Sequence, residues 1–139
     1  MKTKLAFLSI GLLLASAAPA FAHHSFAAEY DANKPVTLKG TVTKIEWTNP
    51  HSRFYLDVKD EKGTLTNWNL ELASPNALVR RGWTRTSLNV GDEVSVEGSL
   101  ARDGSKMANA RVVTLANGRQ VFAGSSGGDA PPPPGDRTR

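Results

Sequence analysis

The chain has 139 residues, of which 40% are hydrophobic, and it contains no cysteine. This length predicts one domain, and the apolar fraction excludes a chain that is disordered throughout. The formal net charge is +4, and removal of Lys2 and Lys4 with a predicted leader leaves 15 basic against 13 acidic residues. Proteins that bind polyanions usually carry a larger surplus, so no nucleic-acid partner is expected.

Residues 1–22 have the three parts of a secretory signal peptide of bacterial type. A basic start precedes an apolar run from Leu5 to Ala18, and Ala20 and Ala22 occupy the small-residue positions of a cleavage site. The apolar run is shorter than the roughly 20 residues of a spanning helix, so no stable membrane insertion is expected after cleavage. We predict cleavage after Ala22, with cleavage after Ala20 as the alternative, and export to the periplasm.

Downstream of the leader, alternation of apolar and polar residues predicts five β-strands, near residues 36–47, 53–59, 64–72, 93–100 and 107–115. In the first strand, Val42 and Ile45 have opposite parity, which predicts a bulge, and Gly40 would let another backbone approach closely. The Asn117-Gly118 pair predicts a tight hairpin, followed by a short extra strand at residues 120–122.

A short helix is predicted at residues 75–81, between the third and fourth strands. Ser74 is a suitable N-cap, Pro75 suits the first helical position, and Gly82 is the expected stop. The order of elements predicts an all-β fold, a small five-stranded OB-like barrel with one short helix between strands 3 and 4. Another small barrel or a sandwich is the alternative.

The predicted barrel domain spans residues 23–122. It begins with an arm at residues 23–34, which ends in the turn cluster Asp31-Ala32-Asn33-Lys34-Pro35. Trp68 shares the parity of its apolar neighbours and is expected in the core, and Trp83 is expected to cover one end of the barrel. From Ala123 onward, glycine, serine and proline dominate, which predicts a disordered tail over residues 123–139.

Several local sequences occur together in this chain: His23-His24-Ser25-Phe26, Trp47-Thr48-Asn49-Pro50-His51, Trp68-Asn69-Leu70-Glu71, Ser74-Pro75-Asn76, Gly82-Trp83 and Gly91-Asp92. As a set they resemble a family of small exported proteobacterial proteins whose domain has no known function. The resemblance implies export and a small barrel. The architecture also resembles that of periplasmic bacterial OB-fold proteins, some linked to stress, although shared architecture does not determine function.

The chain's three histidines carry the first functional hypothesis, which is copper binding. Cleavage after Ala22 would give His23 a free amine beside its ring nitrogen, and the two can chelate one metal. His51 is the preferred third donor, and His24 is its competitor. Nitrogen-rich sites suit Cu(II), so a copper ion is the predicted cofactor. The alternative is that these histidines are solvated and idle.

The other predicted cleavage point also leads to copper. A start at Phe21 would place His23 third in the chain, where the amine, two backbone amides and the imidazole form a different copper site.

A second hypothesis places a small molecule, a glycan or a protein partner on the outer face of strands 2 and 3. OB barrels bind ligands on this face. Its polar side chains are Arg53, Tyr55, Asn67, Asn69 and Glu71. The alternatives are an ordinary solvated surface and, for Glu71, support of a metal ligand. No nucleophile motif is present, so a binding protein is expected rather than an enzyme, with a weak copper-dependent redox enzyme as the third hypothesis.

Overall fold

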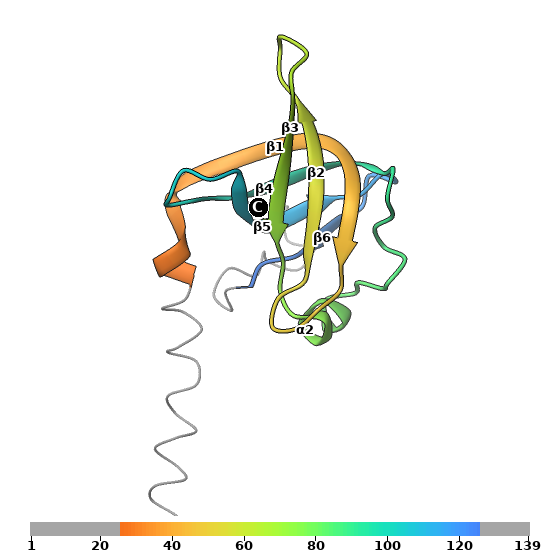
Figure 1. Cartoon of the computed structure of the whole chain (residues 1–139). Coiled ribbons are helices and arrows are strands. Elements are labelled where there is room, and N and C mark those ends of the chain that lie inside the picture. Colours follow the sequence, from red (N-terminus) through yellow and green to blue (C-terminus); the bar gives the residue numbers. More distant parts are fainter. Residues whose placement is uncertain (1–25, 126–139) are drawn as a thin grey trace, which may run out of the picture.

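A 17-residue strand, β1 (Tyr30–Glu46), pairs with a different neighbour along each half of its length. Its N-terminal part lies antiparallel to β4 (Glu93–Ala101), and its C-terminal part lies antiparallel to β2 (Arg53–Lys59). The structure is a computed structural model and describes residues 26–125 of the chain. Figure 1 shows β1, in orange, curving across the barrel to reach both partners.

Three further strands and one helix complete the fold. They are β3 (Leu65–Glu71), α2 (Pro75–Arg80), β5 (Met107–Thr114) and β6 (Gln120–Phe122). The sheet order is β3-β2-β1-β4-β5-β6, and a parallel pairing of β3 with β5 closes the first five strands into a barrel. The predicted all-β, OB-like barrel with a helix between strands 3 and 4 is confirmed, as is the extra strand at residues 120–122.

The bend in β1 lies where the sequence predicts it. The register between β1 and β2 shifts between Val42 and Lys44, so the apolar residues on either side both face inward. A Cβ atom on Gly40 would overlap the carbonyl oxygen of Asp57 in β2. Only glycine therefore allows the two strands to come this close.

The prediction of an arm over residues 23–34 is wrong for residues 30–34, which belong to a β-strand. β1 already begins at Tyr30, and a helical turn at residues 26–29 precedes it. The turn-type residues are accommodated because the pairing with β4 skips register between Tyr30 and Pro35. Within this irregular stretch, the Asn33 amide donates to Asp31 Oδ1 at 3.0 Å.

The two tryptophans that sequence analysis assigned to the barrel behave differently. Trp83 is 1% exposed and its Nε1 donates to the Phe122 carbonyl at 2.9 Å, as expected for a residue that covers the barrel end. Trp68 is only partly buried at the margin of the core, so the prediction that it lies inside the core is wrong. β5 pairs with β3 only at Asn69–Glu71, beyond Trp68, so the Trp68 ring packs against the core only in part, with Lys106 Nζ 5.3 Å from its centre.

The ordered barrel extends past the predicted start of the tail. Ala123 is fully buried, its amide donates to the Arg111 carbonyl, and its own carbonyl accepts from the Ala73 amide. The Gly124 carbonyl accepts from Arg81 Nη1 at 2.6 Å. Glycine- and serine-rich composition did not reveal these contacts because they involve mainly backbone groups.

The predicted signal peptide and residues 126–139 of the predicted tail lie outside the described residues. Within residues 26–125, no helix has the length and apolar character needed to cross a membrane.

Candidate functional site

Glu71, the last residue of β3, is a buried carboxylate that joins several elements of the barrel. It is 4% exposed. Its Oε2 accepts from Tyr30 Oη at 3.0 Å and from Arg53 Nη2 at 2.8 Å, and its Oε1 accepts from Asn109 Nδ2 at 3.2 Å. Burial of a carboxylate is costly unless it is paired and hydrogen-bonded, and here both conditions are met. We call Tyr30, Arg53, Glu71 and Asn109 the Glu71 cluster.

Strand register explains why these four residues meet. Arg53 faces Glu71 across the antiparallel β2–β3 ladder, and Asn109 faces Glu71 across the parallel β3–β5 closure. Tyr30 reaches the same carboxylate from the first position of β1. The cluster extends on both sides, because Arg53 Nη1 donates to Asn69 Oδ1 at 3.1 Å and Asn109 Nδ2 also donates to Ser125 Oγ at 2.6 Å.

The Tyr30 phenol donates a hydrogen bond to the Glu71 carboxylate and stays protonated at any ordinary pH. The residue is 1% exposed. Burial, followed by the neighbouring Glu71 carboxylate, raises the pKa of Tyr30 above its usual value near 10. The Tyr30–Glu71 contact is therefore a hydrogen bond from a neutral phenol to the carboxylate.

His51 lies beside this cluster, in the loop between β1 and β2. The loop is tied to the end of β3, because the Ser52 amide donates to the Ala73 carbonyl and the Leu72 amide donates to the Ser52 carbonyl. The Thr48 hydroxyl donates to the His51 carbonyl at 3.3 Å. These contacts bring the imidazole next to the residues that follow Glu71.

The hydrogen bond of His51 defines which ring nitrogen carries the proton. Nδ1 lies 3.2 Å from the Leu72 carbonyl oxygen and 3.9 Å from Glu71 Oε1. A carbonyl oxygen can only accept, so Nδ1 is the donor and the neutral ring keeps its lone pair on Nε2. Within residues 26–125, Nε2 makes no hydrogen bond. The His51 side chain as a whole is 35% exposed.

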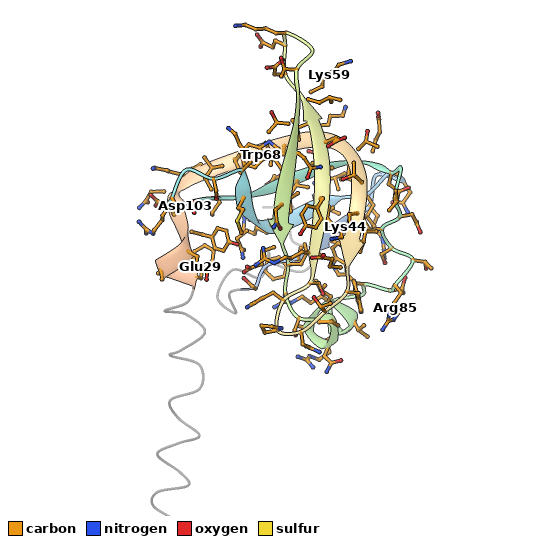
Figure 2. The ribbon with its side chains drawn as sticks, in the orientation of Figure 1. Glu29, Lys44, Lys59, Trp68, Arg85 and Asp103 are labelled. Carbon is orange, nitrogen blue, oxygen red and sulfur yellow. The ribbon has the colours of Figure 1, made fainter. Side chains whose placement is uncertain are left out.

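The segment that leads to the N-terminal histidines joins the barrel next to the same cluster. Arg102 Nε donates to the Ala27 carbonyl at 2.8 Å and to the Tyr30 carbonyl at 3.0 Å, and the Arg102 amide donates to the Glu29 carbonyl. The Phe26 ring lies 5.8 Å from the Tyr30 ring, centre to centre. Figure 2 shows Glu29 close to the turn that carries Asp103, on the opposite side of the view from Arg85.

The predicted ligand face on β2 and β3 divides into two groups. Arg53, Asn69 and Glu71 belong to the Glu71 cluster. Tyr55 instead donates to Glu46 Oε2 at 3.3 Å, and Asn67 donates to Asp57 Oδ1 at 2.7 Å and to Thr43 Oγ1 at 3.2 Å. All five predicted side chains bind a neighbour in the barrel, and these internal contacts occupy polar groups that the hypothesis assigns to a ligand.

Of the three predicted metal ligands, the structure describes His51 alone, since His23 and His24 lie outside the described residues. Between residues 26 and 125, no three histidine, aspartate or glutamate side chains come together in a way that could hold a metal.

Sequence analysis missed Tyr30, Asn109 and Arg102. Asn109 could have been recognised from the sequence, because it is a polar residue within the otherwise apolar start of β5. The sequence gives no such indication for Tyr30 and Arg102, because Tyr30 contacts Glu71, 41 residues away, and Arg102 contacts Tyr30, 72 residues away. Contacts of that kind follow from barrel closure rather than from local sequence.

The comparisons with known proteins concern the family and the architecture. The model of a family described as "Family of unknown function (DUF6152)" matches residues 11–110. The mitochondrial single-stranded DNA binding protein Rim1 of S. cerevisiae is 14% identical, with a TM-score of 0.46, over 59% of this chain and 93% of that chain. The N-terminal domain of PriB from Thermoanaerobacter tencongensis is 23% identical, with a TM-score of 0.41, over 60% and 96%. No curated protein matches the chain.

Proposed function

The chain belongs to the DUF6152 family of unknown function, and from the environment of His51 we propose that it is an exported copper-binding protein without catalytic activity. The copper ion would be held by His51 together with the histidines that begin the mature chain, His23 and His24. Because no relative supplies a function, the proposal depends on the chemistry of these residues.

The observation that carries the proposal is the hydrogen bond from His51 Nδ1 to the Leu72 carbonyl at 3.2 Å. Histidines that bind metals typically donate their second ring nitrogen to a backbone carbonyl or a carboxylate, which fixes the tautomer and the ring orientation. His51 has the carbonyl at 3.2 Å and the Glu71 carboxylate at 3.9 Å on that same side. Its Nε2 is therefore prepared as a ligand.

The remaining donors would come from the mature N-terminus. With the leader removed after Ala22, His23 supplies its amine and its imidazole. The amine has an ordinary pKa near 8, and a bound metal displaces its proton readily near neutral pH. His51 would be the third nitrogen donor, with His24 as its competitor. Three nitrogen donors favour Cu(II) over Zn(II) in the usual order of affinities.

Glu71 is assigned a supporting role rather than that of a ligand. Both of its oxygens already accept hydrogen bonds from Tyr30, Arg53 and Asn109. A metal bound directly to this carboxylate would have to break them. The same internal pairing weakens the hypothesis of a metal-free ligand face, which becomes the outcome if copper does not bind.

The test compares copper affinity between defined forms of the exported, processed protein. An intact mass should first show that the chain starts at His23. The authentic protein should bind one Cu(II) per chain and prefer it to Zn(II). One additional N-terminal methionine separates the amine from His23 and should weaken binding by roughly 100-fold or more, because the chelate is lost.

The substitution His51→Ala should weaken copper binding by roughly tenfold and change the electron paramagnetic resonance spectrum, because one nitrogen donor is replaced. Asn67→Ala is the matched control, because this residue belongs to the other polar group on the same face. If the methionine-extended and His51→Ala proteins bind copper like the authentic protein, the proposed site is wrong. Turnover of oxygen or peroxide by the copper-loaded protein would contradict the non-catalytic assignment.

A further inference from the structure

We propose that the free edge of β3 pairs with the same edge of a second copy of this chain, so that two β2–β3 hairpins join into one continuous sheet. The proposal concerns an interaction surface and does not depend on copper binding. It begins from the unequal pairing of β3. β2 covers one edge of this strand along its whole length, Leu65 to Glu71, whereas β5 covers the other edge only at Asn69–Glu71.

The direction of the backbone groups shows what the free edge offers. The Asn69 amide donates to the Lys106 carbonyl at 3.0 Å, so it points away from β2. Backbone groups of residues two apart in a strand point to the same side. The N–H and C=O groups of Leu65 and Asn67 therefore also point away from β2. Among residues 26–125, no strand and no backbone hydrogen bond reaches these groups on that side.

This edge lacks the features that usually prevent strand pairing between molecules. Natural proteins protect free edges with charged side chains, proline or a bulge. Residues 63–70 contain no charged residue and no proline, and the β2–β3 register runs without a bulge. Leu65 is 61% exposed. The turn at residues 59–62 carries two lysines, one aspartate and one glutamate, whose charges cancel. Two copies of the hairpin can thus approach each other without net repulsion.

The free groups are self-complementary, which selects a second copy as the partner. When two β3 strands run antiparallel about a two-fold axis at Thr66, Leu65 of each strand faces Asn67 of the other. Each such pair exchanges two backbone hydrogen bonds, so the free groups of both residues are satisfied. Other axes would place Gly63 or Asn69 in the new ladder, and both of these amides already donate within the chain. A two-fold contact of this kind closes as a dimer.

Side chains on both faces of the hairpin gain cover from this pairing. On the outer face, Leu65 would lie opposite the partner's Asn67 and diagonal to the partner's Leu65. On the inner face, the partly buried Trp68 would lie opposite the partner's Thr64. Figure 1 shows the hairpin extending past the rest of the barrel, so a second copy can align beside it. Because only the hairpins meet, the interface is small and the dimer should be weak.

The first experiment measures self-association of the processed protein without added metal. Sedimentation equilibrium should show a monomer at about 10 µM and a growing fraction of dimer toward about 1 mM, as expected for a small interface. Leu65→Lys should weaken dimerisation by about tenfold or more, because it removes an apolar contact and brings like charges together across the ladder. Val90→Lys is the matched control, because Val90 is 65% exposed and lies in the turn before β4. It should dimerise like the authentic protein.

The second experiment tests the register of the two strands. The chain has no cysteine, so a single introduced cysteine can form a disulfide only between two molecules. Residue 66 faces its own copy across the two-fold axis, in a pair without backbone hydrogen bonds whose Cα atoms are about 4.5 Å apart. Mild oxidation of Thr66→Cys should therefore give a covalent dimer. Leu65→Cys, although more exposed, should crosslink at least about tenfold more slowly, because it faces Asn67 instead.

Amide hydrogen exchange identifies what covers the edge. The amides of Leu65 and Asn67 should exchange fast in dilute protein and slowly at high concentration. Absence of a dimer, a dimer that Leu65→Lys does not weaken, or equal crosslinking rates at residues 65 and 66 would overturn the proposal. Slow exchange in dilute protein would overturn it as well. If truncation after Ser125 then made exchange fast, the chain's own C-terminal residues would be what covers the edge.

Discussion

The two ends of the β2–β3 ladder have the same sequence pattern and different environments. At one end Arg53 faces Glu71, and two pairs before the other end Asp57 faces Asn67, in both cases as polar pairs on the outer face of the barrel. Glu71 is buried, whereas Asn67 is exposed. The difference arises because Tyr30 and β5 cover the Glu71 end, which we call the closed end. Toward the hairpin, which extends beyond the barrel in Figure 1, Asn67 stays exposed and contacts Asp57 of β2 and Thr43 of β1.

This contrast shows that alternation determines which face of a strand a residue occupies, and that distant segments determine whether that face meets solvent. Lys59 marks the uncovered region in Figure 2, near the tip of the hairpin. α2 begins four residues after Glu71, so it follows the closed end directly, and the Trp83 amide donates to the Leu78 carbonyl of this helix. Substitutions at the closed end should consequently cost more stability than equivalent substitutions toward the hairpin.

The largest expected difference in stability is between alanine variants of the two tryptophans, Trp83 and Trp68. Trp83→Ala should lower the free energy of unfolding by about 3–5 kcal/mol, because it empties a fully buried position and leaves the Phe122 carbonyl without its donor. Trp68→Ala should cost about 1–2 kcal/mol, because its ring is already partly in water. Urea unfolding of both variants measures the difference. Equal losses would show that the uncovered part of β3 is as tightly packed as the closed end.

The carboxylates provide the next comparison. Glu71→Ala should destabilise the barrel by about 3 kcal/mol, because Arg53, Tyr30 and Asn109 all lose their acceptor in a buried site. Asp57→Ala removes the acceptor of Asn67 and should cost less than about 1 kcal/mol, as is usual for exposed pairs. Urea unfolding at neutral pH compares the two. A loss at Asp57 that matches the loss at Glu71 would contradict the distinction between the ends.

The sequence predicts local features of this barrel well and the covered polar site only in part. Strand β2, the helix after Ser74 and the glycine close approach at Gly40 follow from patterns a few residues long, and all are found. Arg53, Asn69 and Glu71 were predicted to share a face, and they do. Burial of Glu71 could not be predicted, because its cover comes from Tyr30 and from β5, both far away in sequence.

The same reasoning applies at the C-terminal boundary, which the sequence places three residues too early. Truncation after Phe122 should lower stability by about 2 kcal/mol, because Ala73 loses its acceptor, Arg81 loses the Gly124 carbonyl, and a buried methyl group is removed. Truncation after Ser125 retains these contacts and should leave the melting temperature unchanged. Thermal unfolding of the two truncated chains measures both values. A melting temperature unchanged by the shorter truncation would restore the boundary at Ala123.

The smallest expected effect concerns Tyr30 alone. At neutral pH, Tyr30→Phe should cost about 1 kcal/mol, the usual net contribution of one hydrogen bond. Because the folded protein holds the pKa of Tyr30 above the value near 10 of the unfolded chain, the unfolded state binds fewer protons above that pH. The free energy of unfolding then falls as pH rises, by up to about 1.4 kcal/mol per pH unit. Tyr30→Phe lacks this contribution and should lose stability less steeply between pH 10 and 12.

A direct titration of Tyr30 tests whether its burial at the closed end causes the fall of the free energy of unfolding above pH 10. The chain has two tyrosines, so in the Tyr55→Phe variant the phenolate absorbance near 295 nm reports Tyr30 only. In the folded variant this absorbance should stay low at a pH where the same chain in concentrated urea is already ionised, because burial and the Glu71 carboxylate both disfavour the phenolate. If the folded and unfolded chains ionise together, Tyr30 is in contact with water. Tyr30 would then contribute nothing to the cover of Glu71, and the contrast between the two ends would depend on β5 alone.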